Sequence, residues 1–580
     1  MNGPFSRARC VASLRERRAR VFRVDATAVG LLWLAAILLT ANGVLAQQSG
    51  NGATDAGRIE RRIERPPDRR EKVPDIAPAV PDGGPAVQVQ PERFTLIGAE
   101  ITGSTVYSAA RLGDFYEGYL GREISLAEVD AIVKAITEQY RSDGYVLSRA
   151  IAPPQPLEFG VLRIRIIEGY VDRVAFAGDR PGRQALLDEM ADRIRAERPL
   201  TLATMERYLL LMADSPGVTV EPGLVEIEPD SGAYRLEIAL AHDRIDGFAT
   251  FDNRGTTTVG PHQIYFGANA NSAFGLLERT RLAAFTVPGA PEELRYGEVD
   301  HEQVLDAEGT RAYFTLSRSI VDIGRTGTSG KENSHGTRVV VGVSHPVLRR
   351  RDSNLTLRLN FDALDSDKNS LNDVYDDRLR VFRLGVEFNA RDGWGGTNWL
   401  SAQLSKGVDI LHASDSDSTL LSRTNGRTRF HKLTLDVTRL QTIGAGWAVQ
   451  ASAAGQASPH TLLSSEEFGV GGSRFGRAYD PSDISGSQGA AGFVELQYDP
   501  PLKLPLLESY QFYAFYDGGA VWGSGFTRAS MVSAGGGVRF HTTYDVSGGV
   551  EVAKPLTRSA TPGEENGDDA RIFFNLYARF

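Results

Sequence analysis

The chain of 580 residues contains one cysteine, Cys10, and only five methionines. A single cysteine excludes both a disulfide scaffold and a cysteine-rich metal centre. Positive charge is not in excess, because the formal net charge is −9, and this argues against a nucleic-acid-binding protein. Long apolar runs are also scarce. Only residues 28–46 form one, which excludes a helical membrane protein with several spans.

The apolar run 28–46 (AVGLLWLAAILLTANGVLA) follows seven arginines and ends in Val44-Leu45-Ala46. This order is typical of a secretory signal peptide, so we predict that residues 1–46 are removed after Ala46. An N-terminal anchor helix is the alternative. Cleavage would remove Cys10, and the mature chain would have a formal net charge of −14, because the leader carries seven arginines and two acids. An exported chain of this kind must be stabilised by backbone pairing and packing.

Residues 47–92 have the composition of a linker, rich in proline, glycine and charge, which cannot bury a core. A short helix is expected at 55–64 (DAGRIERRIE), ending before Pro66-Pro67.

A first α+β unit is predicted over residues 93–168. Ser125 and Glu128 form a capping box, and the residues after it place Val129, Ile132 and Ile136 on one helical face. We expect this face to be core rather than binding surface. Gly144 ends the helix, and the β-branched segment 161–167 reads as a strand.

A second unit, over residues 169–243, repeats the scheme. Its expected elements are a strand at 171–176, a helix at 184–196, a helix capped by Thr201, and strands at 218–220 and 234–241. Two such repeats in tandem suggest a periplasmic binding array.

Residues 244–580 lose helical periodicity and show short alternating segments separated by turn residues. Examples are QIYFGANA (263–270), RAYFTLS (311–317), TLRLNF (356–361), VFRLGVEF (381–388), KLTLDV (432–437) and QFYAFY (511–516). A soluble sandwich would also alternate. However, aromatics lie near segment ends, and the region has room for about 16 strands, more than one sandwich holds. We therefore predict an all-β transmembrane barrel of about 16 antiparallel strands, since closure pairs every backbone group in lipid.

One long motif carries a family resemblance. Residues 468–480 (FGVGGSRFGRAYD), followed by 485–489 (SGSQG), resemble a loop of the outer-membrane transporters of two-partner secretion. These proteins are the haemolysin- and adhesin-exporting branch of the barrel-insertase superfamily. Two weaker similarities agree with it: FDNRG (251–255), which resembles the first barrel strand, and SHPVL (344–348), which resembles a recurring strand end.

The resemblance implies a plug helix in the linker, two periplasmic POTRA domains (93–168 and 169–243) and a barrel over 244–580. It also implies a loop folded into the lumen, with a tip formed by Gly476, Arg477, Ala478 and Tyr479. Ala478 departs from the usual glycine, and Ser487 stands where aspartate is frequent. The terminal Phe580 fits the end of an outer-membrane strand.

The family's tip arginine meets an aspartate on a later strand, and the segment FYDGG (515–519) assigns Asp517 to this role. A bidentate pair between Arg477 and Asp517 would fix the loop, contributing about 1–3 kcal/mol in a wet lumen. The alternative is an ordinary loop charge and an ordinary lumen acid.

The implied function is export of a large unfolded exoprotein of the haemolysin, haemagglutinin or adhesin type. The exoprotein would dock its N-terminal secretion domain on the POTRA domains. The expected location is the Gram-negative outer membrane, with outer-membrane lipid and the barrel-assembly machinery as further partners and no nucleic acid. No catalytic residue, metal or cofactor is expected. Export without ATP is expected, because the segment 324–331 (GRTGTSGK) lacks the spacing of a phosphate-binding loop.

Three alternatives remain at this point. An outer-membrane assembly factor usually carries more POTRA domains. A barrel enzyme would need a nucleophile with a base, but no G-x-S-x-G or H-E-x-x-H motif occurs. A simple porin would not need the α+β units.

Overall fold

The computed structural model describes residues 55–61, 63, 93–156, 159–228, 230–256, 259–324, 331–371, 373–523, 526–559 and 568–580. The predicted signal peptide, most of the predicted linker and most of the segment 324–331 lie outside these residues. Within the linker, the short helix expected at 55–64 is a 3₁₀ helix, η2 (Ala56–Arg61). No helix in the described part of the chain has the length and hydropathy needed to cross a bilayer.

The first α+β unit places two helices against a small sheet whose strand order is β2-β5-β4. Its capping box forms as predicted, and Val129, Ile132 and Ile136 are buried, which confirms that this helical face is core. The elements are β1 (Arg93–Thr95), β2 (Gly98–Thr102), α2 (Ala109–Gly113), η4 (Glu117–Tyr119), β3 (Glu123–Ser125), α3 (Leu126–Ser142), β4 (Arg149–Ile151) and β5 (Val161–Ile167).

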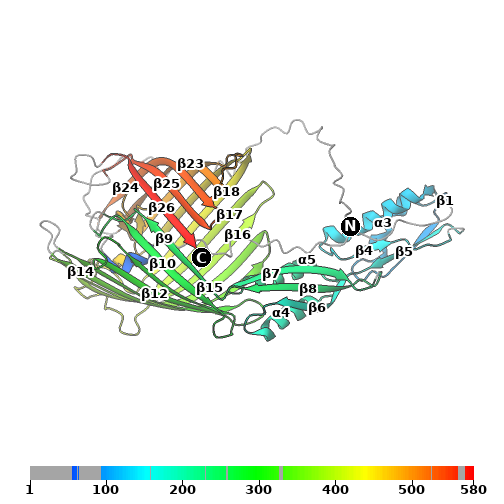
Figure 1. Cartoon of the computed structure of the whole chain (residues 1–580), viewed down its shortest axis with the longest axis horizontal. Coiled ribbons are helices and arrows are strands. Elements are labelled where there is room, and N and C mark those ends of the chain that lie inside the picture. Colours follow the sequence, from blue (N-terminus) through cyan, green and yellow to red (C-terminus); the bar gives the residue numbers. More distant parts are fainter. Residues whose placement is uncertain are drawn as a thin grey trace, which may run out of the picture.

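The second unit repeats this topology. In the three-stranded sheet of each unit, the strand that comes last in the chain lies in the middle, parallel to the first strand of that sheet and antiparallel to the second. Thr201 caps α5 as expected, with its hydroxyl accepting from the backbone N–H of Thr204. The elements are β6 (Tyr170–Gly178), α4 (Gln184–Ala196), α5 (Leu202–Ala213), β7 (Val218–Glu226) and β8 (Ala233–His242). Figure 1 shows the two units in a row beside one end of the barrel.

Sixteen strands then form one closed antiparallel barrel, which confirms the predicted strand number. They are β9 (Ile245–Asp252), β10 (Gln263–Asn271), β11 (Glu278–Thr286), β12 (Leu294–Val304), β13 (Arg311–Ile323), β14 (Glu332–Arg349), β15 (Ser353–Asn369), β16 (Val374–Arg391), β17 (Gly396–Gly407), β18 (His431–Gly444), β19 (Trp447–Ala457), β22 (Gln488–Tyr498), β23 (Leu507–Gly523), β24 (Phe526–Thr542), β25 (Val546–Pro555) and β26 (Arg571–Arg579).

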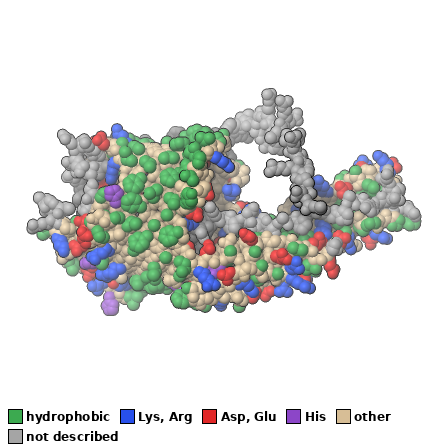
Figure 2. Space-filling view, viewed as in Figure 1, with side chains coloured by type: hydrophobic (Ala, Val, Ile, Leu, Met, Phe, Trp, Pro, Cys, Tyr) green, Lys and Arg blue, Asp and Glu red, His purple; other side chains and the backbone are tan. Residues whose placement is uncertain are grey.

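Alternation along the strands produces an apolar outer face, which is green over the barrel in Figure 2. In β16, for example, Phe382 and Leu384 are exposed while Arg383 between them is buried toward the lumen. At the periplasmic ends of β19 and β22, the rings of Trp447 and Tyr498 lie 4.5 Å apart, as in an interfacial aromatic girdle.

The last strand, β26, closes the barrel against β9. The pairing continues to the final residue, since the backbone of Phe580 exchanges hydrogen bonds with Gly247 at 2.6 and 3.1 Å. Gly247 leaves room for the Phe580 ring, since a Cβ at this position would lie 2.3 Å from the ring and would displace it.

The second α+β unit is packed against the periplasmic turns of the barrel. Arg349 of β14 donates to both carboxylate oxygens of Asp214 at 2.7 Å, and Arg207 and Tyr208 both contact Glu308. Leu211 also packs under the turn at Gly309. Charged and apolar contacts together fix the orientation of this unit on the barrel.

We predict that Arg349→Ala loosens this orientation. The change leaves the half-buried Asp214 carboxylate without its bidentate partner, which costs about 3–5 kcal/mol for a buried pair. Spin labels placed on α4 and on a periplasmic turn should then report a broader distance distribution. Arg244→Ala is the matched control, because its pair with Asp179 is exposed and 3.8 Å long. An unchanged distribution in Arg349→Ala would contradict the prediction.

Candidate functional site: a loop and a short helix inside the barrel

The loop 458–487 connects β19 to β22 and folds back into the barrel. Two short strands within it, β20 (Phe468–Val470) and β21 (Ile484–Gly486), pair with each other and pack against β23. Gly471 makes the return possible, because it has φ +117° and a Cβ there would lie 2.1 Å from the Asp480 carbonyl oxygen.

The predicted tip residues lie together and are buried against β23 to β25. The Tyr479 hydroxyl donates to the Val532 carbonyl at 3.0 Å, and the Ala478 backbone N–H donates to Ser533. Gly476 has φ +74°, whereas Ala478 has a negative φ and needs no glycine. Ser487 is also accommodated, since its hydroxyl accepts from the Leu462 N–H at 2.9 Å.

Arg477 is the charged centre of the tip and is only 4% exposed. Its guanidinium lies over the rings of Phe515 and Phe493, 4.2 and 4.9 Å from their centroids. It donates to Glu495 at 2.6 Å and more weakly to Glu551 at 3.5 Å. Arg477 thus shares the buried carboxylates Glu495 and Glu551 with two further cations, Arg539 and Arg254, in a setting where such contacts are strong and unpaired charge is costly.

The expected bidentate pair between Arg477 and Asp517 is wrong in its geometry. Asp517 is fully buried, but its Oδ2 accepts from the backbone N–H of Arg477 at 3.1 Å, and the guanidinium Nε is 3.6 Å away. Its other oxygen accepts from the Ser533 hydroxyl. The short aspartate is therefore engaged by local donors, and its contact with the Arg477 guanidinium is a single ion pair at 3.6 Å rather than the expected bidentate one.

The longer Glu495 makes the contact expected of Asp517. It accepts from Arg477 and also from both terminal nitrogens of Arg539, at 2.7 and 3.0 Å. Sequence reasoning missed this residue and Glu551. A signal was present, because each acid stands between two apolar residues of an alternating strand, as in Val494-Glu495-Leu496, and must face the lumen.

A second anchor fixes the first part of the loop. Glu466, in the short helix η5 (Ser464–Glu466), accepts from Arg383 at 2.6 Å and from Lys432 at 2.5 Å. These three side chains are all buried. The loop is thus fixed to strands β16 and β18 as well as to the strands around its tip.

The helix η2 occupies the lumen beside this anchor and contacts β13, β14, β15 and η5. Asp55, which directly precedes the helix, accepts from the Ser464 hydroxyl of the loop at 2.5 Å. The backbone of Ala56 bonds to Ser334 and Ser319 at 3.1 and 2.7 Å, while Ile59 is fully buried against the wall. Figure 1 shows this segment in blue inside the barrel.

A continuous series of ion pairs joins the helix to the loop. Glu60 of η2 pairs with Arg338 of β14, and Arg338 pairs with Asp362 of β15. Asp362 also accepts from Arg383 at 3.0 Å, and Arg383 continues to Glu466 of the loop. Because Asp362 and Arg383 each have two partners, movement of either lumen segment changes the pairing of the other.

Comparison with protein families agrees with this architecture. Residues 94–169 match the ShlB-type POTRA domain, and residues 237–540 match the haemolysin secretion/activation protein family ShlB/FhaC/HecB. The chain belongs to this family. It is therefore a two-partner secretion transporter of the outer membrane, with its POTRA region in the periplasm. Members of the family act with a secreted partner protein.

Individual relatives cover most of the chain at low identity. The heme/hemopexin transporter protein HuxB of Haemophilus influenzae is 20% identical over 81% of this chain and 84% of its own length. The outer membrane transporter CdiB of Dickeya dadantii is 25% identical over 74% and 76%. The solved structure of CdiB from Escherichia coli has the same fold, with a TM-score of 0.68, 19% identity and coverage of 93% of this chain and all of that one.

We predict that Glu495→Ala releases the loop tip although the barrel still forms. The change leaves Arg477 and Arg539 without their shortest carboxylate contact, so the loop 458–487 should become sensitive to trypsin. Heat-dependent gel migration checks that the barrel is intact. Glu387→Ala is the control, because its pair with Arg358 is half exposed on the lumen wall of β15 and β16, away from the strands β23 to β25 that surround the loop tip. Equal trypsin resistance in both variants would remove Glu495 from this role.

Proposed function

We propose that this protein exports one large unfolded exoprotein through its lumen, and that η2 and the loop 458–487 close that lumen between export events. The observation that supports the proposal is the kind of contact that holds these two segments in the lumen. Both segments are bound to the wall by side-chain hydrogen bonds and ion pairs rather than by strand pairing. Such contacts are exchanged for water or for a passing chain without opening the barrel.

The POTRA sheets offer a means of recognition. Their outer strands are β2 and β4 in the first domain and β6 and β7 in the second. An extended chain binds such an edge through backbone hydrogen bonds, with limited dependence on side chains. This suits an exoprotein that arrives unfolded and docks through an N-terminal secretion domain of the haemolysin, haemagglutinin or adhesin type.

The path continues from the POTRA domains into the barrel. The second domain is fixed to the periplasmic turns at Arg349 and Glu308, so a chain bound there lies near the barrel entrance. Beside the loop, a cavity of about 540 Å³ is lined by residues that include Glu60, Arg338 and Arg474. Its charged lining accommodates an extended polar backbone. Folding of the exported chain outside the cell would drive export without ATP.

The test is a secretion assay with the exoprotein encoded beside this chain. We expect the exoprotein in the culture medium only when this chain is present. Arg477→Ala should reduce secretion strongly while the barrel stays inserted, because three carboxylates lose their common cation. Arg318→Ala on β13 should secrete normally, because this exposed side chain points outward between the lumen-facing Ser317 and Ser319.

Two results would contradict the proposal. One is exoprotein retained in the periplasm although the intact chain is inserted; assembly of other outer-membrane proteins after depletion of this chain would then be measured, since an assembly factor is the alternative. The other is undiminished secretion by Arg477→Ala, which would show that the loop tip has no role in export.

A further inference from the structure

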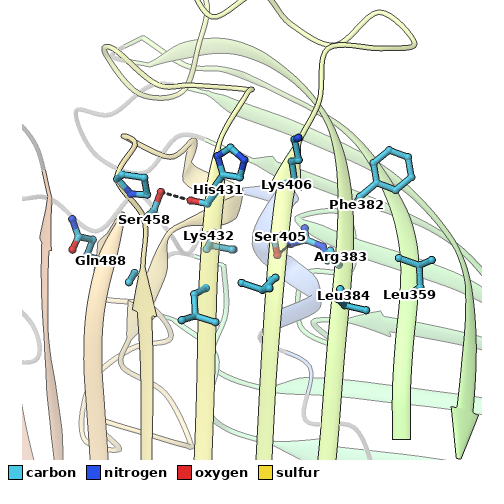
Figure 3. Close-up of a pocket in the computed structure, with 14 residues that line it drawn as sticks. Leu359, Phe382, Arg383, Leu384, Ser405, Lys406, His431, Lys432, Ser458 and Gln488 are labelled. Carbon is cyan, nitrogen blue, oxygen red and sulfur yellow. Dashed lines mark hydrogen bonds between the residues drawn. The ribbon is translucent and has the colours of Figure 1, made fainter.

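The outer face of the barrel carries a hollow of about 690 Å³ across β15 to β22. Strand register builds it, because cross-strand partners place Leu359, Leu384, Leu404 and Leu433 in one row perpendicular to the strands. The row ends at the small Ala457 of β19. Figure 3 shows the hollow from outside, with the aliphatic side chains below and the polar ones above.

Two basic side chains border the hollow at the next outward-facing position of their strands, two residues beyond the leucine row. Lys406 and His431 are direct cross-strand partners on β17 and β18, and both are exposed. Neighbouring positions on the same strands behave differently, since Lys432 faces the lumen and pairs with Glu466. Among the described residues, Lys406 has no acidic side chain within ion-pair distance.

Further positive charge lies at the same border. The rings of His431 and His460 are 5.9 Å apart, and the His431 N–H donates to His460. Burial lowers the pKa of the His460 imidazole, and the charges of His431 and Arg427 lower it further, which disfavours the charged form of His460. The additional positive charge therefore comes from Arg427. Arg427 is exposed and, within the described part of the chain, forms no ion pair either. The border of the hollow therefore presents Lys406 and Arg427, which no acidic side chain of the described residues neutralises.

The hollow lies in the outer half of the membrane span. β17 runs outward from Gly396, and β18 begins at His431 on its return, so Lys406 is one residue from the outward end of its strand. The leucine row below it faces acyl chains, and the lysine above it lies at the level of headgroups. The outward leaflet of a Gram-negative outer membrane consists of phosphorylated glycolipid.

We propose that this hollow binds one phosphorylated glycolipid of the lipid A class. Its acyl chains occupy the row from Leu359 to Ala457, and a phosphate contacts Lys406 with support from Arg427. A lysine at the membrane interface can extend toward water by itself. Its position over an apolar hollow therefore indicates a ligand that has both acyl chains and a negative headgroup. Charge complementarity selects the occupant, because a zwitterionic phospholipid supplies no net negative charge to offset the basic border.

The test uses the full chain in nanodiscs containing trace diphosphoryl lipid A, and native mass spectrometry measures the lipid that it retains. Wild type should retain lipid A in preference to phosphatidylethanolamine and to dephosphorylated lipid A. Lys406→Glu should lower retention about tenfold or more, since a charge-assisted phosphate contact is lost and repulsion replaces it. Ala457→Trp, which fills the end of the hollow, should lower it without changing any charge.

Lys503→Glu is the matched control, because Lys503 is exposed on the periplasmic turn between β22 and β23. It makes the same charge change at the opposite end of the barrel and should retain lipid A as wild type does. Equal retention by Lys406→Glu and wild type would overturn the proposal. So would equal loss in Lys503→Glu, or wild-type retention that does not depend on the lipid phosphates.

Discussion

The width of the barrel is the constraint on which the rest of this structure depends. Sixteen strands enclose a lumen that their own side chains cannot fill, and an unfilled lumen of this size is an aqueous channel. The chain fills it with two of its own segments, η2 and the loop 458–487. Since every strand already has both neighbours, these segments cannot join the sheet and are bound to it by side chains.

That requirement explains why so many charges are buried. Arg477, Glu495 and Asp517 surround the loop tip, and Arg383 and Glu466 fix its first part, all with very low exposure. Buried charges are costly unless paired, so each group is tolerated only when the loop is in place. The same dependence makes the closed arrangement specific, and the shared partners Asp362 and Arg383 extend it to the helix.

The sequence predicted the strands and helices of this protein better than the contacts between their side chains. Alternation in segments such as Val381–Phe388 identifies strands, and the capping box at Ser125 identifies a helix, because both are local signals. The tip from Gly476 to Tyr479 was found through its motif. Its shortest carboxylate contact, with Glu495, was not, because the meeting of Arg477 and Glu495 depends on strand register and loop path. The lumen-facing acids between apolar neighbours were the available signal.

The proposed export requires η2 to move away from the barrel wall, and a disulfide tether between the two tests this requirement. A Cβ at Gly57 would lie 3.3 Å from the Ser366 Cβ, which is close to the spacing of a disulfide. Cys10 is the one native cysteine of the chain, and it lies in the predicted signal peptide. In the variant Gly57→Cys with Ser366→Cys, oxidation should stop exoprotein secretion and reduction should restore it, while each single variant secretes in both conditions. Undiminished secretion with the tether formed would contradict the account.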